Sequence, residues 1–327
     1  MSSVGGVHHV HRLMGASLCQ MPGSVVERLL AMRKDISRFN AARGLRSAVL
    51  YTGGWLVQWH EGPAASVDEA WMRSQAQPGH GHHRVLHRSS GASTLERRLH
   101  IASLHSQEKP NDVARRFYEV QRRLGRHGEP AQAWQCVSAP CLIDPDVTLP
   151  ASARCHLVAV TSELTESMEL VKSIAERLRV PVSYQRFADG DTRNGDVGAA
   201  YVDIATEGQV TRLHAISRRA LEHGMVRLSL QGMRCLLLLL GDRAGSAGRL
   251  SAATRNLLER FHEWPAVRLL GPCRDTTKAV AASLAGMHGL DIHEIDAGVG
   301  RARVDTVLRM IAGTECRVPA GLDVILD

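Results

Sequence analysis

Residues 161–168 lie between a short apolar run and an amphipathic segment, which is where a phosphate-binding loop would lie. A loop of the form GxxxxGK[ST] needs glycines so that backbone N–H groups can surround a phosphate, a lysine for its charge and a hydroxyl for Mg²⁺. Here both glycine positions hold other residues, Ser167 stands at the lysine position and Met168 at the hydroxyl position. Glu163 and Glu166 add negative charge to the loop. The spacing therefore predicts the strand, turn and helix of a phosphate loop without its chemistry.

Other enzymatic constellations are missing from the sequence. It contains no G-x-S-x-G elbow, no H-E-x-x-H pair and no glycine-rich dinucleotide fingerprint after a strand. Residues 241–248 are rich in glycine and follow an apolar run, at the edge where ligands bind in α/β sheets, but they form no G-x-G-x-x-G pattern. We predict a flexible loop there, no catalytic residue and no enzymatic activity.

Two histidine clusters have the ligand type for Zn²⁺ or Cu²⁺. The first stands near the N-terminus and the second in a segment rich in glycine and proline, where nothing is expected to fix ligand geometry. We therefore predict adventitious metal binding and no dedicated metal site. The clusters are His8, His9 and His11, and His80, His82 and His83.

Composition limits the remaining classes of function. The chain has 327 residues, enough for two domains, and its hydrophobic share of 44% is that of a globular protein. Seven scattered cysteines without a CxxC pair favour reduced thiols, and no secretory signal or membrane span is evident, so we expect a cytoplasmic protein. The net charge of +7 is spread along the chain and aromatic content is 4%, so nucleic-acid binding is not expected.

The N-terminal third has the pattern of a ferredoxin-like α+β domain. Apolar periodicity predicts the order strand, helix, strand, strand, helix, strand, strand, with a glycine hairpin turn at residues 52–54. The predicted elements are strands 10–17, 47–51, 55–60, 83–87 and 98–105 and helices 25–40 and 65–75.

Residues 53–63, GGWLVQWHEGP, together with HRLMGAS and FNAARGLRSAVLYT, resemble a BLUF domain, the flavin-binding blue-light sensor module, over about residues 7–105. In that family a tyrosine in the first strand and a glutamine in the third change the hydrogen bonding around the flavin after light-driven electron transfer. The resemblance places Gln58 at the glutamine position and Asn40 at the position of an asparagine that holds the flavin ring. The tyrosine position is Gly15, which cannot donate an electron.

Two further BLUF segments also depart from the family pattern. The D-x-R-H segment corresponds to residues 78–83, PGHGHH, and the last-strand W-s-M piece corresponds to residues 101–103, IAS. Asn40 and Gln58 are therefore predicted as vestigial flavin positions, with no cofactor bound. Without flavin, Asn40 would be a helix C-terminal residue, and Gln58 a strand residue satisfied by backbone partners.

An amphipathic helix over residues 109–128 and an aperiodic stretch follow this domain. The helix carries arginines on its polar side, and we predict that it covers a sheet, with cationic docking as the alternative. Residues 128–153 contain four prolines and are predicted to be the domain linker. The expected domains are thus residues 7–127 and 154–327.

Buried strands alternate with helices in the C-terminal half, after an initial antiparallel hairpin, which predicts a mostly parallel three-layer α/β sheet. The predicted strands are 156–160, 182–186, 199–204, 210–216, 234–240, 267–270 and 291–296, and the predicted helices are 165–178, 218–230, 251–263, 277–287 and 304–311.

The order of these elements, with the altered phosphate loop first, resembles a Ras-like small GTPase of the bacterial gliding-motility type over about residues 155–312. The guanine-reading NKxD motif corresponds to residues 272–275, PCRD, of which only Asp275 matches. The DxxG segment corresponds to residues 216–220 and retains neither its aspartate nor its glycine. Phosphoryl transfer depends on the loop, its lysine and Mg²⁺, so hydrolysis is not expected, and Asp275 is predicted to cap a helix.

These observations favour a non-enzymatic regulatory or scaffolding protein of bacterial signalling that acts through protein–protein interaction. Its expected partner is a signalling or motility component, which could itself be a GTPase, and a homodimer is also possible. The alternative is a flavin-binding sensor of redox state or light coupled to a GTPase-like output domain.

Overall fold

The computed structural model describes residues 9–124, 128–143, 155–191, 193–206, 209–241, 244–271, 273–287 and 289–313. The chain divides into two compact units, the first formed by Met1–Pro140 and Gln185–Val197 and the second by Cys141–Tyr184 and Gly198–Asp327. Predictions that concern His8, Pro272, residues 144–153 and residues 242–243 fall outside the described residues.

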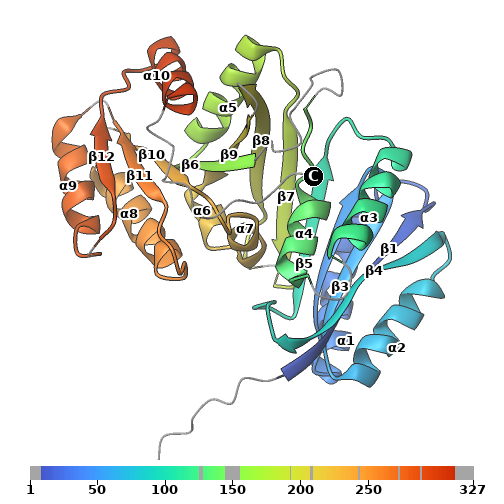
Figure 1. The fold of residues 1–327 in the computed structure, drawn as a ribbon. Helices are drawn as coiled ribbons and strands as arrows, with labels where there is room; N and C mark the ends of the chain where they lie inside the picture. The colour runs from blue at the N-terminus through green and yellow to red at the C-terminus, as the bar shows by residue number, and fades with distance from the viewer. Residues whose placement is uncertain are drawn as a thin grey trace, which may run out of the picture. The chain divides into compact units, whose positions relative to one another are not determined.

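The first unit has the predicted element order, and five strands and two helices follow one another as expected (Figure 1). In this unit the strand order is β7-β5-β2-β3-β1-β4. β1 pairs antiparallel with β3 and β4, and β2 pairs antiparallel with β3 and parallel with β5. Its elements are β1 (His9–Cys19), α1 (Val25–Ala42), β2 (Arg46–Thr52), β3 (Trp55–Gly62), α2 (Ala64–Gln75), β4 (His80–Ala92), β5 (Leu99–His105), α3 (Pro110–Leu124), α4 (Pro130–Ser138) and β7 (Ser183–Asp189).

The helices of the first unit pack on both faces of its sheet. On one face α1 and α2 enclose apolar residues of β1, β2, β3 and β5. On the other face aromatic pairs join β3 to α3 and α4: the Trp55 and Phe117 rings lie edge to face at 5.3 Å, and the Trp59 and Trp134 rings lie 5.8 Å apart.

Helix α4 lies within the segment predicted to be a linker, so that prediction is wrong for Pro130–Ser138. Its Trp134 is fully buried, and Ala133 and Val137 are also buried. The burial of these side chains fixes the helix on the sheet, and Pro130 begins it in the first turn, where a missing N–H has no cost. The helix thus belongs to the core of the first unit.

β7 comes from the C-terminal half of the sequence but belongs to the first unit. The carboxylate of Asp189, 3% exposed, pairs with Arg97, and Asp196 pairs with Arg33 at 3.6 Å. The expected domains are continuous in sequence, whereas the compact units are not, because residues 185–197 complete the sheet of the first unit.

The second unit contains the predicted, mostly parallel sheet. Its strand order is β12-β11-β10-β6-β9-β8, in which all neighbours are parallel except the antiparallel hairpin β8–β9. Its elements are β6 (Cys155–Ser162), α5 (Glu166–Leu178), β8 (Val197–Thr206), β9 (Gln209–Ser217), α6 (Arg218–Leu221), α7 (Gly224–Ser229), β10 (Cys235–Leu239), α8 (Ala244–Leu258), β11 (Ala266–Leu270), α9 (Arg274–Leu284), β12 (Ile292–Ile295) and α10 (Arg301–Ala312).

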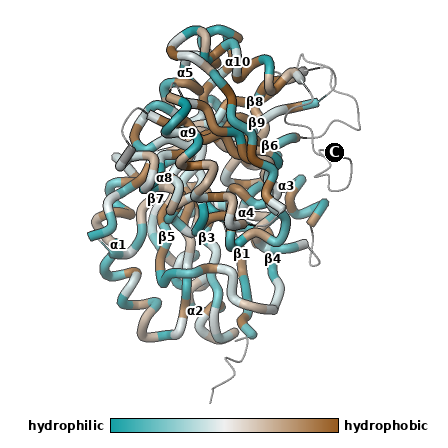
Figure 2. The backbone as a smooth tube through the Cα atoms, turned by 90° about the vertical axis from the view of Figure 1, so that its left-hand side faces the viewer, coloured by the Kyte–Doolittle hydropathy of each residue, from teal (hydrophilic) through white to brown (hydrophobic). Residues whose placement is uncertain are grey.

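Apolar strands in the middle of the second unit form its core, as the brown segments of β6, β8 and β9 show in Figure 2. α5 and α10 bury their apolar residues against one face of the sheet. α8 and α9 lie on the other side (Figure 1). Within the described residues no helix has both the length and the apolar character needed to cross a bilayer.

One helix prediction and one loop prediction in the second unit are wrong. The predicted helix 218–230 is two short helices, α6 and α7, separated by a break around His223, whose ring accepts a hydrogen bond from the backbone of Met225. The predicted flexible loop over residues 241–248 is helical from Ala244 onwards, so Gly245 and Gly248 lie in the first turns of α8.

Candidate functional site

Gly15 and Gln58, which the BLUF resemblance places at its tyrosine and glutamine positions, lie opposite each other in the register of β1 and β3. Both face α2, because a Cβ atom at Gly15 would overlap the six-membered ring of Trp71, and the Gln58 amide reaches Ser74. Trp71 is 7% exposed. The indole ring therefore occupies the space beside Gly15 that a tyrosine side chain would need.

Gln58 belongs to a chain of buried hydrogen bonds. Its Nε2 donates to Ser74 Oγ at 2.5 Å, and its Oε1 lies 3.3 Å from His60 Nε2. His60 Nδ1 lies 2.8 Å from Ser47 Oγ. Burial lowers the pKa of His60 to about 4, so the ring is neutral at pH 7, and a proton on Nε2 satisfies both contacts. The predicted backbone partners of Gln58 are thus wrong, since side chains satisfy its amide.

Asn40 lies in the last turn of α1 and is 2% exposed, as the C-terminal position predicted. Its Nδ2 donates to the backbone carbonyl of Arg98 at 2.6 Å. Its own backbone carbonyl accepts from the N–H groups of Arg43 and Leu45. The side-chain hydrogen bond links the end of α1 to the strand that begins at Leu99. Among the described residues, no hydrogen bond joins the Asn40 side chain to Gln58.

The rest of the hairpin motif serves the architecture of the unit, which sequence reasoning missed. Oε2 of Glu61, 1% exposed, accepts from the backbone N–H groups of Thr94 and Leu95 and from Ser93 Oγ, at 2.8–3.0 Å. At Gly62 a Cβ atom would lie 2.9 Å from the carbonyl oxygen of Gly44. These two residues would be needed with or without a flavin, so their presence does not distinguish a ligand-binding domain from one without ligand.

The altered phosphate loop of the second unit lies at the point where the strand order reverses, because β6 has β10 on one side and β9 on the other. Ligands of open α/β sheets bind outside the carboxyl ends of the strands at such a point. Ser167, at the lysine position, is fully buried and donates through Oγ to the backbone carbonyl of Ile216 at 3.1 Å. Its N–H donates to Ser162 Oγ at 3.0 Å. The loop is therefore closed by its own hydrogen bonds.

Glu163 lies in the same loop and pairs with two arginines. Its Oε2 lies 3.1 Å from Arg218 Nε, and its Oε1 accepts from Arg249 Nε at 2.8 Å. Arg218 begins α6, directly after β9, and Arg249 lies on α8, after β10. The carboxylate predicted to repel a phosphate is thus already paired with two guanidinium groups, one directly after β9 and one in the second turn of α8.

Asp275 lies in the first turn of α9, but it is not the cap that we predicted. The N-cap residue is Cys273, without a side-chain capping hydrogen bond. The N–H of Thr276, its hydroxyl and the N–H of Asp275 lower the pKa of the Cys273 thiol, because they stabilise a thiolate. Asp275 therefore adds negative charge to the first turn of α9 but does not cap the helix.

The second histidine cluster lies in β4 and not in a loop, contrary to the prediction. His80 Nδ1 lies 3.1 Å from Ser17 Oγ, and His83 packs edge to face on Trp71. In the described part of the chain, no three histidine, cysteine or acidic side chains are placed to hold a metal ion.

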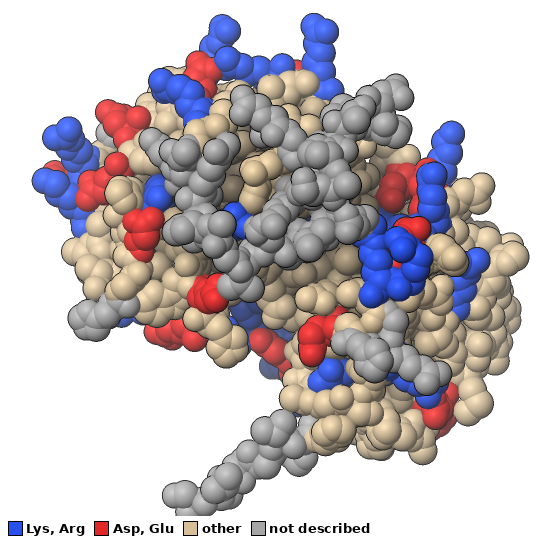
Figure 3. All heavy atoms as spheres, in the orientation of Figure 1, with Lys and Arg blue, Asp and Glu red and all other residues tan. Residues whose placement is uncertain are grey.

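The arginines of α3 are paired with acidic side chains, which favours the predicted role as a helix that covers the sheet. Arg116 contacts Glu108 at 2.9 Å, and Arg122 contacts Glu119 at 3.0 Å. Figure 3 shows acidic groups interspersed among the basic side chains of the visible face.

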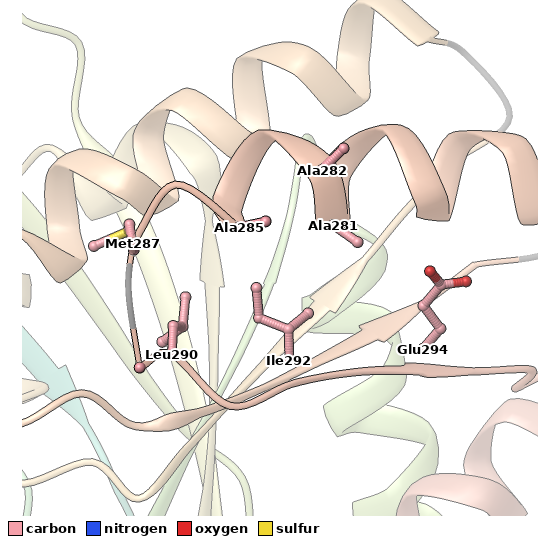
Figure 4. Close-up of a pocket in the computed structure, with 8 residues that line it drawn as sticks. Ala281, Ala282, Ala285, Met287, Leu290, Ile292 and Glu294 are labelled. Carbon is pink, nitrogen blue, oxygen red and sulfur yellow. The ribbon is translucent and has the colours of Figure 1, made fainter.

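A groove of about 440 Å³ lies between α9 and β12 in the second unit (Figure 4). Its walls are mainly small and apolar, and its polar side chain is a single carboxylate, that of Glu294. Such a lining suits apolar contact and offers no acid–base pair. The groove contains none of the residues singled out in the sequence; it is lined by Ala281, Ala282, Ala285, Met287, Gly289, Leu290, Ile292 and Glu294.

No protein-family model and no curated protein matches the sequence. Among solved structures the chain is similar to "BlrP1 BLUF", with 20% identity over 28% of this chain and 63% of that chain and a TM-score of 0.25. It is also similar to the BLUF protein BlrB in its dark state, with 22% identity over 36% of this chain and 87% of that chain and a TM-score of 0.26. For a bacterial light-regulated adenylyl cyclase the identity is 10% over 67% of this chain and 82% of that chain, with a TM-score of 0.29. The chain thus spans less than two thirds of the BlrP1 structure.

Proposed function

We propose that this chain is a non-enzymatic regulatory or scaffolding protein that combines a BLUF-like unit with a GTPase-like unit and acts through protein–protein interaction. One observation carries the proposal: at both positions where the resemblances imply a ligand, the chain's own side chains fill the space. Trp71 covers Gly15 in the first unit, and Glu163 engages Arg218 and Arg249 in the second.

The GTPase-like part of the proposal is supported by the strand order of the second unit. The altered loop follows the central strand β6, and the antiparallel hairpin β8–β9 precedes the parallel strands β10, β11 and β12. Hydrolysis of GTP needs charge stabilisation by a lysine and Mg²⁺, and the loop supplies Ser167 and Glu163 instead. We therefore assign this unit no nucleotide chemistry and a surface for a protein partner.

The partner class that fits this proposal is a signalling or motility component, including a GTPase, and a homodimer is the second option. Affinity capture from the native cell, followed by a binding measurement with the purified partner, tests the proposal. Binding should not change with added GTP, added flavin or blue light. An affinity that rises or falls with one of these three would contradict it.

A flavin-binding sensor coupled to the GTPase-like unit is the second candidate. The specific observation in its favour is that Asn40 and Gln58 both keep the amide groups that the BLUF resemblance requires, and that both are buried. Purified protein with the blue absorption band of flavin would favour this candidate, and redox sensing would then be expected because Gly15 cannot donate an electron.

A further inference from the structure

We propose that Arg218 and Arg249 form an anion-binding site that Glu163 occupies in the intact chain, so that removal of this one carboxylate creates a site for phosphate. This inference rests on the proposed function, in which the second unit binds no nucleotide, and it identifies Glu163 as the residue that prevents anion binding there.

The position of the three residues is that of a ligand site. Glu163 and Arg218 directly follow the adjacent parallel strands β6 and β9, and Arg249 lies in the second turn of α8, the helix after β10. β6 is the strand at which the order reverses. Ligands of open α/β sheets bind at this place, so the three side chains lie where a ligand site is expected.

Each oxygen of the Glu163 carboxylate lies near a different guanidinium group. Oε1 accepts a hydrogen bond from Arg249 Nε at 2.8 Å, whereas Oε2 lies 3.1 Å from Arg218 Nε without forming a hydrogen bond. The Glu163 side chain is only 14% exposed and that of Arg218 only 21%. A tetrahedral phosphate presents the same kind of oxygen acceptors and is bound well by the planar donors of arginine.

The charges near the loop explain why the carboxylate closes the site. With Glu163 present, two guanidinium charges face Glu163 and Glu222, the latter of which accepts from Arg218 at 2.9 Å. Without Glu163, Arg249 has no acidic partner among the described residues, and its side chain, 60% exposed, can be reached from solvent. The N-terminus of α5, which follows directly, adds partial positive charge. Glu166 and Glu169 in the first turn of α5 oppose it.

The test compares Glu163→Gln with the unaltered chain, using inorganic phosphate as the probe. Glutamine keeps the shape of the side chain and removes its charge. We expect phosphate to bind the variant at least about tenfold more tightly, as measured by titration calorimetry and by a phosphate-dependent rise in Tm at constant ionic strength. Glu163→Ala gives a second measurement if the amide itself blocks the site, and circular dichroism verifies that each variant is folded.

A matched control separates the site from a general change in charge. Glu169→Ala removes a carboxylate from the same helix start, where Glu169 accepts a hydrogen bond from Thr165 and pairs with no arginine in the described part of the chain, and it should leave phosphate binding unchanged. Arg249→Ala added to Glu163→Gln should abolish the gain. The proposal is wrong if folded Glu163→Gln and Glu163→Ala bind phosphate no better than the unaltered chain, or if Glu169→Ala gains as much. Binding of GTP by the unaltered chain would instead overturn the proposed function.

Discussion

The two units close off their two candidate positions with different chemistry. In the first unit, an aromatic ring, Trp71, lies against Gly15, and neutral hydrogen bonds satisfy Gln58. In the second unit, a carboxylate, Glu163, lies between two arginines. An indole ring therefore fills one position, and an ion-pair cluster fills the other.

The energetic consequences of the two closures differ. Burial of an indole ring removes a large apolar area from water and is insensitive to salt. A partly exposed ion-pair cluster contributes little and is weakened by salt, because solvent and ions screen its charges. The first closure should therefore contribute to folding stability, whereas the second should mainly determine which ions can bind.

The largest expected effect is that of Trp71→Ala. Trp71 is 7% exposed and fills the space beside Gly15, so its loss should leave a cavity and lower the free energy of unfolding by about 3–5 kcal/mol. Urea unfolding measures this change. Met72→Ala is the matched control, since Met72 is 60% exposed and should change stability by less than about 0.5 kcal/mol. Equal effects of the two variants would show that Trp71 does not fill the site.

Gly15→Tyr should be the next most damaging change. The new side chain must displace the Trp71 ring, and overpacking of this kind costs about 1–3 kcal/mol. In the background of Trp71→Ala, the same substitution should be less destabilising or should restore stability, because the phenol can enter the space that the indole leaves. A Gly15→Tyr variant as stable as the parent would contradict the packing described here.

Acid should destabilise both units through buried histidines. Burial lowers the pKa of His60 to about 4 and that of His214 to about 3, from an ordinary value of 6.5. The unfolded chain therefore binds more protons than the folded chain below pH 6.5. The free energy of unfolding should be highest above this pH and should decrease as the pH drops toward 4. Each histidine should lower the free energy of unfolding by on the order of 2 kcal/mol when the pH is changed from 7 to 5.

Urea titrations at the two pH values measure this loss. His60→Asn should reduce the pH dependence, whatever it does to stability at pH 7, because the titrating group is gone. A variant that keeps the full pH dependence of the parent would show that His60 does not cause it.

Glu163→Gln should have the smallest effect on stability, at most about 1 kcal/mol. Arg249 is largely exposed, and Arg218 keeps Glu222 as a partner. The difference from the parent should shrink at high salt, which thermal unfolding at two ionic strengths measures. A salt-independent loss of several kcal/mol in the free energy of unfolding would indicate a structural role for the Glu163 carboxylate. The two units would then not differ in how much these side chains contribute to stability.

Most strands and helices could be predicted from the sequence because their apolar residues repeat at a regular spacing. The β6 strand and the α5 helix follow directly from the run beginning at Cys155 and from Leu170, Val171 and Ile174. Helix α4 was missed although Pro130, Trp134 and Val137 mark its start and buried side, because the surrounding prolines suggested a linker. The membership of β7 in the first unit depends on its place beside β5 in the sheet and on the ion pair of Asp189 with Arg97, 92 residues apart, which local pattern does not encode.

The candidate sites were predictable only in part. Their locations follow from the hairpin motif and from the strand-loop-helix at residues 161–168. The side chains that fill the sites do not follow from the sequence, because they are distant from the sites along the chain. Trp71 lies against Gly15, and Arg218 and Arg249 pair with Glu163, only after folding. Trp71 of α2 fills the space near Gly15, whereas the neighbouring strand residues Met14 and Trp59 do not. For Met14 and Trp59 the reason is the alternation of β1 and β3, which turns their side chains to the face opposite that of Gly15 and Gln58.

The most direct test of the account is the absorption spectrum of the purified chain after incubation with excess flavin and gel filtration, followed by a blue-light difference spectrum. If Trp71 closes the site, the protein should elute without the blue flavin band, and light should cause no spectral shift. A stoichiometric flavin band in the unaltered chain would contradict the account, and a reversible red shift on illumination would show that the photochemistry does not require a tyrosine at Gly15.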